Sequence, residues 1–241
     1  MNEQRLYLAS KSPRRRALLE QIGLRYELLD IDIDESPHPG EAAADHVCRL
    51  ALEKARAGAQ ALLARGKRAP PVTAAPDSTT DGTACSPTMA PATPAPAWVL
   101  GADTVVVIGG SVLGKPSDSS MARTMLRRLS NRSHEVMTAV SVVTVDATPA
   151  APRIAPIRVA LSRTEVRFRA LARDEIDAYV QSGEPLDKAG AYAIQGLAAM
   201  FVQSIHGSYS GVMGLPLFET TGLLRSTGFK VPLSTAPTAS D

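Results

Sequence analysis

Short apolar runs typical of β-strands alternate along this chain with segments that have the apolar spacing of α-helices, and this alternation constrains the fold most. The clearest strand signal is the β-branched run from Trp98 to Ile108. The clearest helix signal is the alanine- and leucine-rich stretch from Glu41 to Arg65. Strands mixed with helices throughout predict an α/β or mixed α+β protein in which helices cover a layered sheet.

The remaining elements follow from the same two kinds of pattern. A helix is predicted to open at Ser12, with Ser as N-cap and Pro13 at the first helical position, and to end at Gly23. Further strands are predicted at residues 6–9, 26–33, 111–113, 136–145, 157–168 and 199–205, and further helices at 117–129, 174–181 and 216–226.

Three segments differ from the rest in composition. Residues 66–97 are rich in Pro, Ala, Thr and Ser and nearly lack large apolar side chains. Such a segment cannot offset its ordering entropy by burial, so we expect a disordered insertion. Residues 146–156 are expected to form a loop, and residues 230–241 a flexible tail. The rest, within 1–229, is predicted to be a single domain interrupted by that insertion.

Composition excludes several classes of function. Aromatic residues make up 4% of the 241 residues and the net charge is +2, which predicts no stacking platform or basic footprint for a nucleic-acid polymer. No apolar run approaches the roughly 18 residues that a membrane helix needs. The first residues lack the apolar segment of a signal peptide, and two cysteines cannot build a disulfide framework. We therefore expect a cytoplasmic protein without a membrane partner.

Three arginines, at positions 14–16, crowd the first turn of the first predicted helix. Cations are disfavoured at the positive end of a helix dipole, by about 0.3–1 kcal/mol each. An anion bound by the free backbone N–H groups and the guanidinium groups would make the three positive charges favourable at this position. The turn follows a strand directly, where α/β proteins commonly bind ligands. The alternative is a solvated basic turn.

Asp103 interrupts the apolar run of the longest predicted strand. A buried carboxylate without a partner is costly, so Asp103 needs a cation, a hydrogen-bond donor or a water molecule. A metal ion or an activated water is the functional interpretation. A capped bulge or a turn at the strand end is the alternative.

Three further charged residues are weaker candidates. The segment Gly109 to Pro116 nearly fits a phosphate-binding P-loop, but Pro116 replaces the hydroxyl residue that would hold Mg²⁺, so only Lys115 remains as a charge for phosphate. Lys54 lies within the long helix and could be an ordinary surface lysine. Glu35 ends an acidic cluster that could help to hold Mg²⁺ or could simply be solvated.

The segment from Asp187 to Gly196 mixes polar groups with small residues. Small residues let the backbone approach a ligand closely. Gln195 offers a donor and acceptors, which suits recognition of a base edge. An ordinary turn is the alternative. No zinc-ligand spacing, nucleophile elbow or dinucleotide fingerprint is present in the sequence.

Taken together, these segments resemble the Maf family of nucleotide pyrophosphatases. The resemblance spans roughly residues 6–228, and its blocks occur in the order of the family. Two departures from the family pattern are Ala193, where a Gly is usual, and Asn131, which replaces a common Gly and is expected to lie in a turn. The matching blocks are 8–10 with 12–15, 53–55, 101–105, 114–116, 134–136, 182–192, 194–196 and 214–216.

The resemblance implies a fold similar to inosine-triphosphate pyrophosphatases, with a long mixed sheet flanked by helices and a central cleft. It implies hydrolysis of a nucleoside triphosphate to a monophosphate and diphosphate with a divalent metal, Mg²⁺ or Mn²⁺. The form of the block at 187–192 resembles the branch that acts on dTTP and UTP. The alternatives are the sister branch that acts on 7-methyl-GTP, and a cell-division regulator without chemistry. A homodimer is expected from the family alone.

The resemblance also implies roles for individual residues. Asp103 would be the proton acceptor. Glu35 matches another polar position of the active site, and we expect it to join Asp103 as a metal ligand. The positions associated with substrate choice are Arg14, Thr104 and Gln195. Lys188 would help to read the base. The phosphate-binding positions would be Ser10, Arg15, Lys54 and Lys115.

Overall fold

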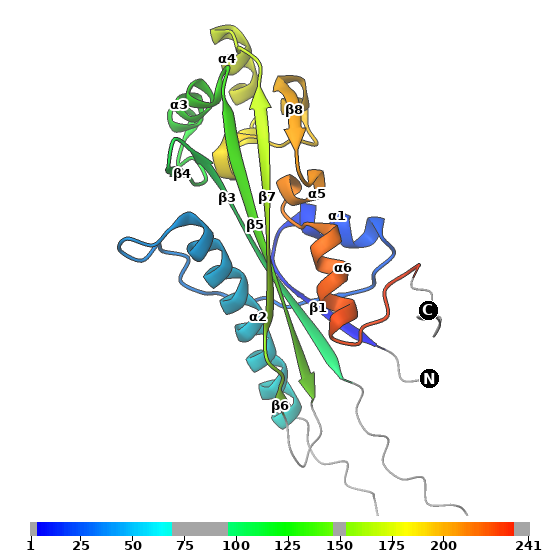
Figure 1. The fold of residues 1–241 in the computed structure, drawn as a ribbon. Coiled ribbons are helices and arrows are strands. Elements are labelled where there is room, and N and C mark those ends of the chain that lie inside the picture. Colours follow the sequence, from blue (N-terminus) through cyan, green and yellow to red (C-terminus); the bar gives the residue numbers. More distant parts are fainter. Residues whose placement is uncertain (1–3, 69–95, 147–152, 234–241) are drawn as a thin grey trace, which may run out of the picture.

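The computed structural model describes residues 4–68, 96–146 and 153–233, which form a mixed eight-stranded sheet flanked by helices (Figure 1). The main strand order is β2-β1-β3-β5-β7-β8; β4 pairs with β3, and β6 pairs with β5. β1 is parallel to both of its neighbours, and all other pairs are antiparallel. The predicted fold class is confirmed. The strands are β1 (Arg5–Ala9), β2 (Glu27–Leu28), β3 (Ala97–Ile108), β4 (Ser111–Leu113), β5 (Ser133–Asp146), β6 (Arg153–Ile154), β7 (Arg158–Phe168) and β8 (Val202–His206).

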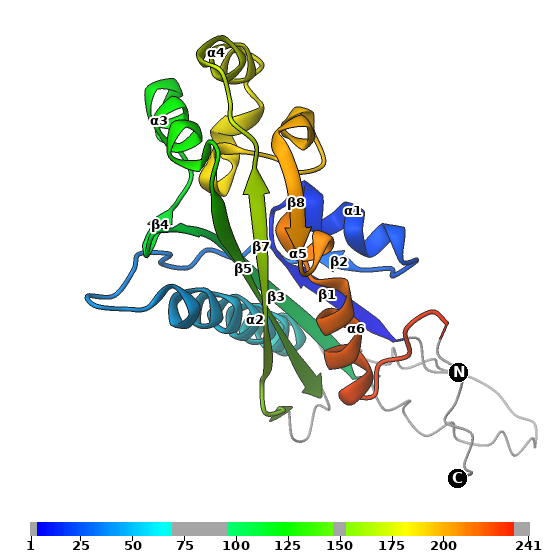
Figure 2. The same cartoon turned by 45° about the horizontal axis from the view of Figure 1, so that its top comes forward.

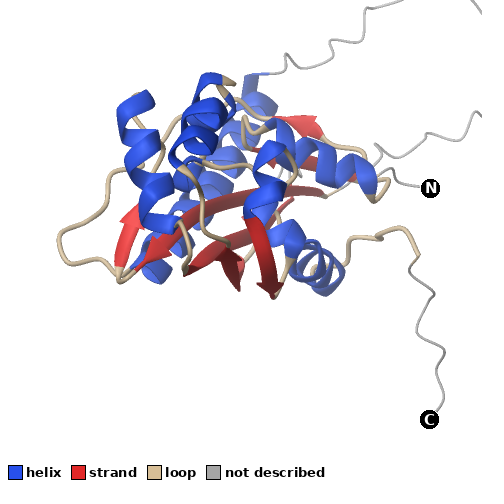
Figure 3. Ribbon diagram, turned by 90° about the horizontal axis from the view of Figure 1, so that it is seen from above, coloured by secondary structure: helices blue, strands red, loops and turns tan. Residues whose placement is uncertain are grey.

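The helices cover both faces of the sheet and one of its ends (Figures 2 and 3). Within the described ranges, six are α-helical and three are short 3₁₀ segments. In the part of the chain that the structure describes, none of them is long and apolar enough to cross a membrane. The helices are α1 (Pro13–Gln21), α2 (Ala43–Arg68), α3 (Ser119–Leu129), α4 (Arg173–Gln181), η1 (Glu184–Asp187), η2 (Ala189–Ala191), η3 (Leu197–Phe201), α5 (Tyr209–Met213) and α6 (Leu217–Ser226).

Successive side chains of β3 alternate between two different cores, because a strand presents its residues to opposite faces. Val99 and Val105 pack in clusters with apolar residues of α2. Leu100 and Ala102 pack with apolar residues of α1 and α6. A fourth cluster, at the far end of the sheet, joins β3 to α3 and α4. Consecutive residues of β3 therefore reach opposite sides of the sheet.

Gly101 lets α2 lie unusually close to β3. A Cβ atom built on Gly101 would lie 2.3 Å from the carbonyl oxygen of Ala51 and 2.6 Å from the amide nitrogen of Ala55. Both atoms belong to the helix backbone and cannot give way as a flexible side chain would. Only glycine fits at this strand position with the helix in its present place.

Three local predictions need correction. The strand predicted at 26–33 is confined to β2, because only Glu27 and Leu28 pair with β1 and the chain then leaves the sheet towards α2. The strand predicted at 199–205 begins only at Val202, since η3 precedes it, and α5 was not predicted. Ser12 precedes α1 in an extended conformation, but its side chain makes no capping hydrogen bond.

The segments of unusual composition fall largely outside the described residues. Of the predicted insertion at 66–97, residues 69–95 are not described, α2 continues to Arg68, and β3 begins at Ala97. Within the predicted loop at 146–156, β6 pairs with β5. Of the predicted tail, only residues 230–233 are described, and Val231 is buried against the α1 and α6 core.

Burial of His134 predicts a loss of stability in mild acid. His134 is 3% exposed, and this burial lowers its pKa from the ordinary 6.5 to about 4. Between pH 7 and pH 5, His134 takes up a proton in the unfolded chain but stays neutral in the folded chain. The free energy of unfolding should therefore fall by about 2 kcal/mol because of this residue. Denaturant unfolding at both pH values should show that loss, and His134→Gln should remove about that much of it. Equal losses in the two proteins would contradict the prediction.

Candidate active site

The part of β3 that carries Asp103 and Thr104 lies in a gap between two neighbouring strands. β1 pairs with β3 only as far as Gly101, and β4 pairs with it from Val106. Residues 102–105 therefore lack a strand partner on this edge of the described sheet, while β5 pairs along the other edge. An edge left open at the carboxyl end of a parallel strand is a common ligand site in α/β sheets.

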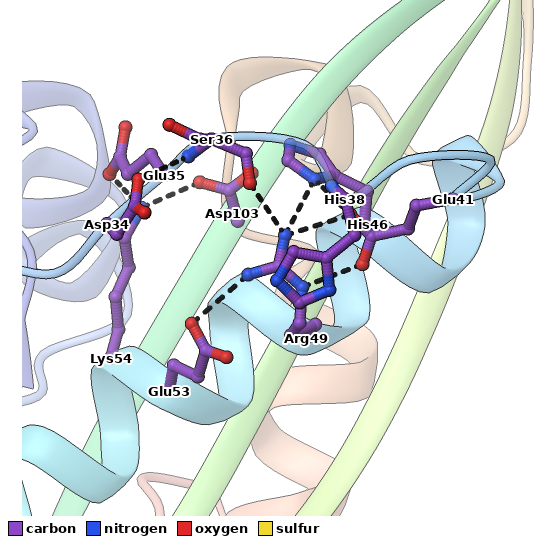
Figure 4. A network of polar contacts seen from close by, with 10 residues as sticks. All are labelled: Asp34, Glu35, Ser36, His38, Glu41, His46, Arg49, Glu53, Lys54 and Asp103. Carbon is purple, nitrogen blue, oxygen red and sulfur yellow. Dashed lines mark hydrogen bonds and ion pairs between the residues drawn. The ribbon is translucent and has the colours of Figure 1, made fainter.

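On the α2 face, the ammonium of Lys54 bridges two carboxylates. Lys54 Nζ lies 2.7 Å from Asp103 Oδ1 and 2.7 Å from Glu35 Oε1 (Figure 4). The side chains of Lys54 and Asp103 are 11% and 13% exposed, whereas that of Glu35 is 55% exposed. The cluster is thus buried at its base and open to solvent beside Glu35. Lys54 is no solvated surface lysine, and Asp103 has the cationic partner that its place in the strand requires.

On the opposite face, the buried guanidinium of Arg15 joins three parts of the chain that are far apart in the sequence. It donates from Nε to the carbonyl oxygen of Gly214 at 2.7 Å, from Nη1 to Ser10 Oγ at 2.9 Å and from Nη2 to Thr104 Oγ1 at 3.2 Å. Burial lowers the pKa of Arg15, and the negative charge of Asp103 opposes this shift. Arginine keeps its charge in proteins, so a fixed cation lies behind Thr104.

Thr138, on β5, extends this arrangement by one hydrogen bond. Its Oγ1 lies 3.0 Å from Thr104 Oγ1 and 2.7 Å from the carbonyl oxygen of Gly211. A hydroxyl has one proton and a carbonyl only accepts, so Thr138 donates to Gly211 and accepts from Thr104. Thr104 in turn accepts from Arg15, and the chain of hydrogen bonds fixes the direction of all three side chains.

Two further predicted cations, Arg14 and Lys188, share one carboxylate. Arg14 Nη1 is 3.9 Å from Asp187 Oδ2, and Lys188 forms an ion pair with the same carboxylate. The segment that carries Asp187 is tied to the loop before Lys115 by a hydrogen bond from the amide of Gly190 to the carbonyl of Gly114, at 3.0 Å.

Lys115 acts electrostatically on Glu35. Partial burial raises the pKa of Glu35, but the hydrogen bond from Lys54 and the charges of Lys54, Lys115 and Arg15 outweigh it, so the pKa of Glu35 lies below its ordinary value. Glu35 is therefore ionised near neutral pH, and a negative charge stands among three cations.

Gln195 is the predicted site residue that the structure does not join to the others. Its side chain is exposed, and no hydrogen bond within the described residues connects it to the cluster. Its neighbour Gly196 lies against Glu184, because a Cβ atom there would meet the carboxylate oxygen of Glu184 at 2.4 Å. The segment is thus held in place, although the side chain of Gln195 is not.

The donor set fits a divalent cation. Oxygen ligands suit Mg²⁺, which usually keeps several of its waters. Among the described residues there is no group of three or more His, Cys, Asp or Glu that could hold a metal ion. The carboxylates of Glu35 and Asp103 are the predicted ligands. These carboxylates already converge on one cationic group, the Lys54 ammonium. A cation that completes its coordination with water molecules fits this pair.

Sequence reasoning missed the residues that hold the site residues in position. Thr138 is fully buried, but threonine is common in strands and gave no signal. Gly214 was noted as part of a motif, without its carbonyl being assigned to Arg15. Arg49 and Glu41 lie within the helix predicted at 41–65 and have no predicted role; the opposite charges of the two residues are the signal that could have found them.

Two surface hollows lie at the far end of the sheet. One, of about 520 Å³, is lined in part by Arg128, Arg132 and Arg167, and the other, of about 380 Å³, in part by His134 and Glu135. None of the predicted site residues lines either hollow. The charged cluster at Asp103 is separate from both.

The fold and the site define an α/β protein with a mixed sheet and one open strand edge. Two carboxylates and the Lys54 ammonium lie on one face of that edge, and the Arg15 guanidinium lies on the other. A family model described as Maf-like protein matches residues 5–227. The chain belongs to the Maf family, which confirms the resemblance seen in the sequence.

Three relatives of similar length share the same name. A protein of Aromatoleum aromaticum is 46% identical over 234 residues, which cover 93% of this chain and 96% of the relative. One of Burkholderia lata is 46% identical over 227 residues, covering 92% of each chain, and one of Methylobacillus flagellatus is 46% identical over 232 residues, covering 96% and 97%. Each of the three is named dTTP/UTP pyrophosphatase.

Proposed function

We propose that this chain is a nucleoside triphosphate pyrophosphatase that hydrolyses dTTP and UTP to the monophosphate and diphosphate. The observation that carries the proposal is the placement of Asp103 at an open strand edge, bonded to Lys54 and backed by Arg15. The names of the relatives support the choice of substrate, as does the match along almost the whole chain.

Asp103 would accept the proton of a water molecule that attacks the α-phosphorus. Lys54 occupies Oδ1, so Oδ2 is the atom that would take the proton. A well-placed general base is worth roughly 10²–10⁴-fold in rate. Diphosphate would leave, and the monophosphate would retain the new oxygen.

The cations would oppose the negative charge of the triphosphate, which otherwise repels a nucleophile. Lys54 and Lys115 would neutralise phosphate charge on the α2 face of the sheet, where Glu35 lies. At the N-terminus of α1, phosphate would be bound by Arg14, Arg15 and Ser10. A Mg²⁺ or Mn²⁺ ion on Glu35 and Asp103 would supply further charge neutralisation and polarise the phosphate oxygens.

Arg14, Thr104, Gln195 and Lys188 would select the base. We expect Gln195→Ala to change the ranking of dTTP, UTP and CTP by kcat/KM while hydrolysis continues, because the exposed Gln195 can turn towards a base but holds no other site residue. Steady-state kinetics on the three nucleotides checks this. An unchanged ranking would remove Gln195 from substrate choice.

A nucleotide panel tests the function. Purified protein with Mg²⁺ or Mn²⁺ should release diphosphate from dTTP and UTP in preference to 7-methyl-GTP. Preference for 7-methyl-GTP would assign the chain to the sister branch. Release from none of them, over a titration of both metals, would leave a regulator without chemistry. We further propose a cytoplasmic location and a homodimer, which cell fractionation and light scattering would test.

A further inference from the structure

Glu35 lies on the long loop between β2 and α2, and this loop has its own attachment to α2. Arg49, in the second turn of α2, donates from Nε to Glu41 Oε1 at 2.7 Å and from Nη2 to Glu41 Oε2 at 2.8 Å (Figure 4). The same Nη2 donates to the backbone carbonyl of Ser36 at 3.0 Å. Ser36 is the residue next to Glu35, so Arg49 binds the loop directly beside the carboxylate.

The loop is closed on itself around the same contact. The amide of Ser36 donates to Asp34 Oδ1 at 2.9 Å, and the amide of His38 donates to Glu41 Oε2 at 3.1 Å. Glu41 is also 2.9 Å from His46 Nδ1. Both oxygens of Glu41 thus have partners inside the protein.

Burial and charge give this contact its strength. The side chains of Arg49 and Glu41 are 17% and 9% exposed. The hydrogen bonds from Arg49 hold the pKa of Glu41 well below its ordinary value. A bidentate arginine–carboxylate pair fixes direction as well as distance, which a single lysine cannot do.

One helix therefore carries both parts of the arrangement. Arg49 Nη1 also lies 3.3 Å from Glu53 Oε2, one turn further along α2, and the next residue is Lys54, which reaches Glu35 and Asp103. The same helix thus supplies Lys54, which bonds to Glu35, and Arg49, which holds the loop that carries Glu35. The contact to Ser36 therefore supports the half-exposed Glu35, whose own carboxylate is bonded to Lys54.

We propose that Arg49, together with Glu41, is a positioning residue that holds Glu35 beside Lys54 and Asp103 for the reaction. This proposal rests on the proposed pyrophosphatase activity. Arg49 touches none of the proposed reacting groups, so its effect on turnover passes through Glu35.

A double-mutant cycle tests the proposal. Arg49→Gln should lower kcat/KM for dTTP about tenfold, at the lower end of the loss usual for residues that orient a ligating side chain. In protein that already carries Glu35→Gln, Arg49→Gln should have almost no further effect, because the group that it positions is gone. Arg123→Gln is the control, since it removes an ion pair with Asp177 at a similar distance of 2.7 Å between α3 and α4. The control should keep its activity.

Hydrogen exchange gives a readout that does not depend on activity. Arg49→Gln should speed amide exchange at Ser36 and His38, and Arg123→Gln should not. Arg49→Lys, which keeps a charge facing Glu41, is a second variant if Arg49→Gln folds poorly, and it should speed exchange at the same amides. If the unmodified chain hydrolyses no nucleotide, the proposed function is wrong. Hydrogen exchange then still tests whether Arg49 holds the loop. Unchanged exchange, or an equal loss of kcat/KM with and without Glu35, would overturn the proposal.

Discussion

Replacing Asp103 with Asn is expected to lower kcat/KM for dTTP and UTP by roughly 10²–10⁴-fold, the usual contribution of a general base. The amide cannot take a proton from water at neutral pH. The fold should survive, because Lys54 keeps its second carboxylate partner, Glu35, at 2.7 Å. Steady-state kinetics together with thermal unfolding measures both effects.

Asp177→Asn is the matched control for this substitution. Asp177 also accepts a hydrogen bond from a cation at 2.7 Å, but its partner is Arg123, in the layer of α3 and α4. This variant should retain activity. Near-complete activity of Asp103→Asn, in protein that unfolds at the usual temperature, would remove Asp103 from the chemistry.

Gly101→Ala is expected to lower the free energy of unfolding by about 3 kcal/mol, the upper end of the usual cost of overpacking. The new methyl group would meet backbone atoms of α2 at 2.3 Å and 2.6 Å, so the helix itself has to move. Since α2 carries Lys54, we also expect kcat/KM to fall, by about 10²-fold for a displacement near 1 Å. Denaturant unfolding and kinetics on the same preparation check the two effects.

Gly222→Ala provides the contrast. Gly222 lies inside α6, and a Cβ atom there would meet nothing within 4 Å. Alanine favours a helix over glycine by about 0.5–1 kcal/mol, so this variant should be slightly more stable and fully active. A Gly101→Ala protein as stable and active as Gly222→Ala would show that α2 does not depend on the close contact at Gly101.

Local patterns predicted the elements that matter most for the site. β3 follows from its β-branched run and α2 from its Ala and Leu spacing, because both signals lie within the element itself. Asn131 was expected in a turn, and its φ of +56° is a conformation that asparagine tolerates better than most residues. The cost of burying Asp103 in an apolar strand required a partner, and the structure supplies Lys54.

Other features depend on contacts that no local pattern contains. Asp and Ile alternate at 30–34 as in an exposed strand, yet on this side β1 pairs only with Glu27 and Leu28, which come before this segment. The meeting of Lys54 with Asp103 joins positions 49 residues apart and depends on the space left by Gly101. The role of Arg49 depends on a backbone carbonyl, at Ser36, which sequence does not mark.

The central claim is that one open edge of β3 brings a carboxylate and cations together on the two faces of the sheet, so that water attacks the α-phosphorus of a pyrimidine triphosphate. Hydrolysis of UTP in water enriched in ¹⁸O, followed by mass spectrometry of the products, tests this claim most directly. The account predicts one ¹⁸O atom in the monophosphate and none in the diphosphate, at a rate that collapses in Asp103→Asn. Label in the diphosphate, release of single phosphate groups, or the same rate in Asp103→Asn would contradict it.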